Sequence, residues 1–163
     1  MDISYIKDAN FKIKAKTGTV ALDETKLMIS HKTGREDFVI TNPGEYEVEG
    51  ISVFGYKADE SNIYVIQFED IRVLYLGNLV KPLTEKNITD LENIDVVIVP
   101  TDAMPIKDVI EMVSKLEPYY VLPFGELRDK FVASYEHGSR SVKSLNLSKV
   151  SLPEDLTEVI VFE

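Results

Sequence analysis

The sequence predicts a layered α/β protein, and two patterns lead to this fold class. The first half contains short runs of β-branched and aromatic residues separated by polar turns, which is typical of antiparallel strands. From Pro82 onward, stretches with helical periodicity alternate with short apolar runs, as in β-α-β units. A strand-rich half followed by this alternation favours sheets that pack against helices.

The first half is expected to be an antiparallel meander. Apolar side chains at Phe11 and Ile13 alternate with Lys12 and Lys14, the period-two pattern of a strand with one face in the core and one in water. The Asn42-Pro43-Gly44 triplet predicts a turn, because proline presets φ and glycine permits a positive φ. Further strands are expected at residues 19–22, 26–30, 38–40 and 46–54, with a polar loop over 31–37.

The central stretch from Ile63 to Pro100 predicts the core of the fold. The runs 63–68 and 71–77 form a hairpin around Glu69-Asp70, and Val96–Val99 is a short apolar run typical of a strand buried on both faces. Functional groups often lie where a buried strand gives way to a loop, which draws attention to Asn78 after Leu76-Gly77.

Three helices are predicted in the second half. Thr84 is the expected N-cap of the first, and apolar positions from Ile106 to Leu116 mark a second, amphipathic helix. Leu127, Phe131 and Tyr135 predict a third, ending at His137-Gly138 with a left-handed glycine. Strands are expected at 119–123 and 159–162, and the serine-rich stretch 139–144 is expected to be a loop.

Composition excludes several classes of function. The 163 residues are expected to form one domain, 1–163, and a net charge of −10 argues against nucleic acid and anionic membranes as partners. The chain has no cysteine, so disulfides and thiolate metal ligands are absent. It has no apolar run of about 20 residues and no signal-peptide pattern at its start, so a cytoplasmic location is expected.

Several stretches, taken together, resemble the metallo-β-lactamase fold family, especially its small zinc-dependent hydrolase-like members. The resemblance implies an αβ/βα sandwich of two mainly antiparallel or mixed sheets with helices outside, in a compact version. It also implies zinc ligands on loops at one edge of the sheets, where the metal activates a water molecule. The stretches run in the same order as in the family: Asn42–Gly50, Val73–Leu79, Pro82-Leu83-Thr84, Ile94–Pro100, Leu116-Glu117-Pro118, Val121-Leu122-Pro123 and Ser151-Leu152-Pro153.

The chain departs from the family at the metal ligands. If His31 takes the first position of the family's His-x-His-x-Asp-His motif, Thr33, Arg35 and Glu36 take the other three. Asn78 stands where the resemblance implies a bridging carboxylate, and Gly125 where it implies a late histidine. A lone imidazole does not hold zinc, so no metal or other cofactor is predicted.

Four residues remain as candidates at this vestigial site. His31 is a lone ligand or a remnant loop residue, and Asn78 binds a polar ligand or caps a loop. Asp102 and Glu126 each follow a strand that ends near a proline, so both are expected at the same sheet edge. Two carboxylates there could act as acid and base or bind Ca²⁺, but isolated acids on loops are more often simply solvated.

The sequence therefore predicts a non-catalytic, metal-free protein that acts as a binding or assembly module. An exposed sheet edge or the vacated site could support a homo-oligomer or a protein partner. One alternative is a metal-dependent hydrolase whose site is rebuilt or shared between subunits. Another is a small-molecule-binding protein, and no pattern in the sequence identifies its ligand.

Overall fold

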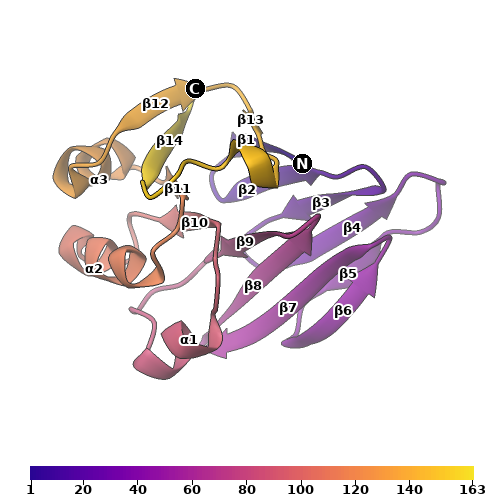
Figure 1. Cartoon of the computed structure of the whole chain (residues 1–163). Coiled ribbons are helices and arrows are strands. Elements are labelled where there is room, and N and C mark those ends of the chain that lie inside the picture. The colour runs from indigo at the N-terminus through magenta and orange to yellow at the C-terminus, as the bar shows by residue number, and fades with distance from the viewer.

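Alternating apolar residues build a six-stranded sheet from the first forty residues and one late strand. The computed structural model describes residues 1–163 and places this sheet against a second one (Figure 1). Its strands pair antiparallel throughout. In spatial order they are β13 (Leu145–Asn146), β1 (Asp2–Lys7), β2 (Asn10–Lys14), β3 (Gly18–Leu22), β4 (Leu27–His31) and β5 (Phe38–Ile40).

The second sheet has eight strands, antiparallel on one side and parallel on the other. The predicted hairpin around Glu69-Asp70 is confirmed, and both turn residues have positive φ, 49° and 65°. The strands β9, β10, β11, β14 and β12 pair parallel with one another in this spatial order, as in β-α-β units, whereas β9 pairs antiparallel with β8. The order is β6 (Gly44–Val48), β7 (Ile51–Ala58), β8 (Ser61–Phe68), β9 (Ile71–Tyr75), β10 (Val96–Pro100), β11 (Tyr120–Phe124), β14 (Glu158–Phe162) and β12 (Ser139–Val142).

Two apolar cores hold the layers together. One lies between the sheets, and the other lies between the eight-stranded sheet and the helices. Strands β10 and β11 are buried at every position, so each contributes to both cores. The expected sandwich fold is thus confirmed, with all three α-helices on the outer face of the eight-stranded sheet: α1 (Glu85–Asp90), α2 (Ile106–Leu116) and α3 (Arg128–Tyr135) (Figure 1). A short 3₁₀ helix, η1 (Lys149–Ser151), lies between β13 and β14 in the chain.

Local signals placed the first two helices correctly. Thr84 caps α1 and forms a reciprocal capping box with Asn87. Helix α2 buries Val109, Met112, Val113 and Leu116, the apolar stripe that its periodicity predicts. None of the helices combines the length and the hydrophobicity of a membrane-spanning segment.

Three local expectations were wrong. The serine-rich stretch 139–144 contains strand β12 rather than only a loop, because parallel pairing with β14 overrides its weak strand propensity. Helix α3 ends with Glu136 in the left-handed conformation, not Gly138, and His137 stacks on the Tyr135 ring with centroids 3.9 Å apart. The Asn42-Pro43-Gly44 segment carries the chain from β5 to β6, which belong to different sheets, so it does not close a meander.

One buried hydrogen bond joins the two sheets. The Tyr75 hydroxyl, from β9, donates to the carbonyl oxygen of Ala9 in the β1–β2 turn at 2.6 Å, and Tyr75 is 2% exposed. Burial, aided by the negative charges of Asp23 and Glu24, raises the pKa of this phenol. Burial also raises the pKa of Tyr64 and of Tyr135.

These buried phenols predict a loss of stability at alkaline pH. Above about pH 10 the unfolded chain releases phenol protons that the folded protein retains, so the free energy of unfolding falls as the pH rises. We expect Tyr75→Phe to lower this free energy by about 1 kcal/mol at neutral pH, because the Ala9 carbonyl loses its donor. In this variant the free energy of unfolding should also fall less steeply at alkaline pH, since one of the titrating phenols is gone.

Urea unfolding as a function of pH measures both effects. Tyr56→Phe is a suitable control, because no protein group is hydrogen-bonded to the Tyr56 hydroxyl. The prediction would be contradicted if the free energy of unfolding fell equally steeply at alkaline pH in Tyr75→Phe and in the unmodified protein.

Candidate functional site

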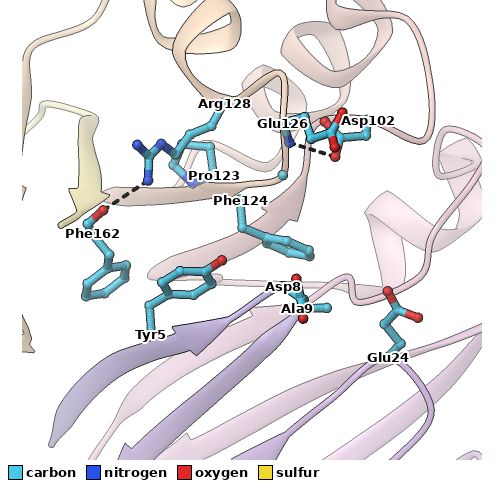
Figure 2. Close-up of a pocket in the computed structure, with 11 residues that line it drawn as sticks. Tyr5, Asp8, Ala9, Glu24, Asp102, Pro123, Phe124, Glu126, Arg128 and Phe162 are labelled. Carbon is cyan, nitrogen blue, oxygen red and sulfur yellow. Dashed lines mark hydrogen bonds between the residues drawn. The ribbon is translucent and has the colours of Figure 1, made fainter.

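A cleft of about 430 Å³ opens where the carboxyl ends of β10, β11 and β14 meet the turns of the six-stranded sheet. Asp102 and Glu126 come from the loops after β10 and β11, while Asp8 and Glu24 come from the β1–β2 and β3–β4 turns across the opening (Figure 2). The cleft therefore combines both sheets. Its lining residues are Tyr5, Asp8, Ala9, Glu24, Asp102, Pro123, Phe124, Gly125, Glu126, Arg128 and Phe162.

Aromatic side chains form the inner wall of the cleft. Phe124 and Phe162 end two neighbouring strands, are 7% and 4% exposed, and belong to the core between the sheets. The Tyr5 ring stacks on Phe162 with centroids 6.3 Å apart. Because core packing fixes these rings, the wall is rigid and apolar.

The Asp102 carboxylate shapes the outer edge of the cleft. Its Oδ2 accepts a hydrogen bond from the Glu126 amide and its Oδ1 one from the Leu127 amide, both at 2.8 Å. These are free amides at the start of α3, where a negative charge also interacts favourably with the helix dipole. Asp102 thus acts as the N-terminal cap of α3 from a neighbouring loop, and both its oxygens have donors.

Gly125 allows this arrangement. Its φ is +111°, a conformation that residues with a side chain rarely adopt. A Cβ atom on this residue would lie 2.8 Å from Asp102 Oδ1 and closer still to Oδ2. The carboxylate of Asp102 therefore occupies the space that any side chain at position 125 would need.

The remaining charges make the cleft negative. Asp8, Glu24 and Glu126 are exposed, and none of the four lining carboxylates takes part in an ion pair. Arg128 is the one cationic lining residue, and its guanidinium donates to the Phe162 carbonyl at 3.0 Å and pairs with Asp129 at 3.3 Å. The carboxylates consequently dominate the electrostatic field in the opening.

A second hollow continues the negative surface beside the cleft. It shares Asp8, Ala9 and Glu24 with the cleft and adds Asp23. Although partial burial favours the neutral acid, hydrogen bonds from the backbone and hydroxyl of Thr25 lower the pKa of Asp23. Asp23 therefore stays ionised to lower pH than an ordinary aspartate.

Two of the four sequence candidates do not line the cleft. The imidazole Nδ1 of His31, at the end of β4, lies 2.6 Å from Glu49 Oε1, so this side chain links β4 to the β6–β7 turn. Asn78 has an exposed side chain, and its backbone carbonyl accepts a hydrogen bond from Ser61 Oγ at 3.1 Å. The structure brings Asp102 and Glu126 together and leaves His31 and Asn78 apart from them.

Sequence reasoning missed the half of the cleft that belongs to the six-stranded sheet. Asp8 and Glu24 lie in short turns, and Tyr5 lies on β1. The only local signal is an acidic residue in a turn, which is common in any acidic protein. Their convergence depends on how the two sheets stack, which no short pattern encodes.

The residues at this edge do not fit the zinc ion that the family resemblance implies. No three His, Cys, Asp or Glu side chains gather in a geometry that could hold a metal. His31 is paired with Glu49, Asp102 is hydrogen-bonded to backbone amides, and position 125 has no room for a side chain. A zinc site needs at least three protein ligands around an open position.

The contact between Asp102 and Gly125 predicts strong coupling between these two positions. We expect Gly125→Ala to lower the free energy of unfolding by about 1–3 kcal/mol through backbone strain and the clash with the carboxylate. Asp102→Ala should cost about 1–2 kcal/mol, because two amides at the start of α3 lose their acceptor.

The double variant should lose less stability than the sum of the two single variants, because Asp102→Ala removes the group that the new methyl would meet. Chemical denaturation of all four proteins measures this coupling. Strict additivity would show that the two residues do not compete for the same space.

Comparison with known proteins agrees with this architecture. At 21% identity, the chain is similar in structure to a putative zinc-dependent hydrolase of the metallo-β-lactamase superfamily from Thermotoga maritima, with a TM-score of 0.79 over 99% of this chain and 98% of that one. It is also similar to the metallo-β-lactamase fold protein YhfI from Bacillus subtilis, at 13% identity and a TM-score of 0.51, over 81% of this chain and 55% of that chain. At these identities the two structures show the fold alone.

Sequence comparison gives the family. A search of curated proteins finds no significant match. The family model described as the β-lactamase superfamily domain, in contrast, matches residues 30–125, from the end of β4 through the β10 and β11 strands that carry the cleft. The chain therefore belongs to the β-lactamase superfamily.

Proposed function

We propose that this protein is a non-catalytic, metal-free member of its superfamily that binds a small organic cation in the cleft. The observation that carries the proposal is the set of four carboxylates without ion-pair partners, placed at the mouth of a rigid aromatic wall. A ligand with an ammonium group and an apolar body matches both parts. The protein would then serve as a binding module.

Electrostatics supports a cationic ligand. Asp8 and Glu24 face Asp102 and Glu126 across the opening (Figure 2), and a concave, partly apolar site concentrates the field of such charges. An anionic ligand would meet these carboxylates with only Arg128 to oppose them, and that guanidinium already has two partners. A cation would also interact favourably with the faces of Tyr5 and Phe124.

The chemistry of the lining residues supports a non-catalytic role. Hydrolysis by the zinc enzymes needs a metal-bound water with a lowered pKa, and the residues of this edge do not provide a ligand set for the metal. Asp102 has an evident structural task, because its carboxylate accepts hydrogen bonds from the Glu126 and Leu127 amides at the start of α3. The Thermotoga maritima structure described as a putative hydrolase shares the fold, and a fold does not determine an activity.

Binding of a simple aromatic amine tests the proposal. We expect benzylamine to raise the melting temperature in a saturable manner, because a ligand specific to the folded state stabilises it by about 2.7 kcal/mol at 100 times its Kd. Benzoate and benzyl alcohol should have no such effect, and added salt should weaken the binding of the amine.

Charge-neutral variants identify the residues responsible. Glu24→Gln and Glu126→Gln should each weaken benzylamine binding several-fold, because they remove a carboxylate with almost no change of volume. Glu154→Gln, on an exposed residue outside the cleft, is the matched control. If benzylamine produces no shift, or if all three variants bind it equally well, the proposed ligand class is wrong.

Metal analysis tests the non-catalytic part of the proposal. Protein purified without chelators should contain far less than one zinc or manganese ion per chain. Near-stoichiometric metal, lost together with hydrolase activity in His31→Ala, would instead establish the alternative of a rebuilt or intersubunit metal site.

A further inference from the structure

No α-helix covers the outer face of the six-stranded sheet. All three α-helices pack on the other sheet, as Figure 1 shows, and the second apolar core contains no residue from β1 to β5. The inward-facing side chains of these strands, such as Phe11, Ile13 and Ile29, belong to the core between the sheets. Their neighbours along each strand must therefore point outward, because side chains alternate.

The strand register places these outward residues in continuous rows. One row runs across five strands through Ser4, Lys12, Ala21, Met28 and Val39. The next row runs through Asp2, Lys14, Thr19 and Ser30. Short side chains, such as Ala21 and Thr19, lie in the middle of the rows, so the surface of the sheet is recessed there.

A hollow of about 530 Å³ lies over this centre. Lys7 and Lys12 border it together with Ile6, and Thr19, Ala21 and Ser30 line its floor. Ile6 is 59% exposed, and Val39, further along the face, is 50% exposed. The aliphatic side chains of this face, Ile6, Ala21, Met28 and Val39, lie among polar ones, and the small central side chains permit the close approach of a helix.

The charge of this face is opposite to that of the whole chain. Lys7, Lys12 and Lys14 form no ion pair, and the acid among the outward residues of the two rows is Asp2, opposite Lys14. The chain as a whole carries −10. A positive face on a strongly negative protein favours a negative partner.

We propose that this face, from β1 to β5, docks an amphipathic helix of a partner protein in which acidic residues flank an aliphatic stripe. Such a helix would cover the bare sheet face as α2 covers the other sheet, with its aliphatic stripe over Ala21 and Met28 and its acids beside Lys7 and Lys12. A second copy is a poorer match, because face-to-face packing about a twofold axis would bring the same lysines together. Nucleic acid and anionic lipid are recognised by larger clusters of basic residues than Lys7, Lys12 and Lys14 provide.

An NMR titration with designed peptides tests this inference. The probe is a synthetic amphipathic helix of leucine, alanine and glutamate, and the control peptide has glutamine in place of glutamate. We expect saturable amide shifts confined to β1–β5 with the acidic peptide only. The double variant Lys7→Glu/Lys12→Glu should weaken binding by about tenfold or more, since it reverses both charges beside the hollow.

The matched control is Lys107→Glu/Lys130→Glu, which makes the same charge change at exposed, unpaired lysines on α2 and α3. It should bind the peptide as the unmodified protein does, and melting curves should show that both double variants remain folded. Benzylamine should still bind in the cleft of both double variants, which separates this inference from the proposed function.

Four results would overturn the inference. Two concern affinity: the two double variants weaken binding of the acidic peptide equally, or the glutamine peptide binds as tightly as the acidic one. Two concern the NMR spectra: the amide shifts lie outside β1–β5, or no shift occurs at peptide concentrations up to about 1 mM. A dimer in sedimentation that Lys7→Glu/Lys12→Glu dissociates would identify a second copy as the occupant instead. Binding to anionic vesicles that the same variant abolishes would identify a lipid surface.

Discussion

The need to bury both faces of the eight-stranded sheet organises this molecule. Strands β10 and β11 are apolar at every position, so each of them requires a layer on either side. The six-stranded sheet covers one face and the helices cover the other. The six-stranded sheet, whose strands alternate apolar and polar residues, needs only one covered face. This asymmetry leaves its outer side open to water or to a partner.

The cleft results from the same stacking. Where β10, β11 and β14 end, the loops that follow meet the turns of the other sheet, and the terminal aromatic residues of the core become the wall of an opening. Tyr75 bonds to Ala9 in this region and holds the β1–β2 turn against the larger sheet. Negative residues from both sheets then face the same space. The chemistry of the cleft is therefore a property of the assembled sandwich, and no single loop carries it.

Much of the fold could be predicted from local patterns, and less of the site. The capping residue Thr84, the stripe of α2 and the turn at Glu69-Asp70 act over a few residues, so periodicity and turn chemistry locate them. Strand β12 depends on a partner far along the chain, which explains why its serines suggested a loop. In the cleft, Asp102 and Glu126 follow neighbouring parallel strands, so the sequence was enough to predict that they lie close together. The positions of Asp8 and Glu24 could not be predicted in this way, because these residues approach from the other sheet.

The close fit of Asp102 against Gly125 limits the substitutions that these two positions accept. Placing a histidine at position 125 requires that Asp102 first be replaced or moved, yet replacing Asp102 alone removes two hydrogen bonds from the start of α3. Each of the two changes is therefore destabilising on its own, and the cost of the second depends on whether the first is present. We expect substitutions at positions 102 and 125 to arise as a pair.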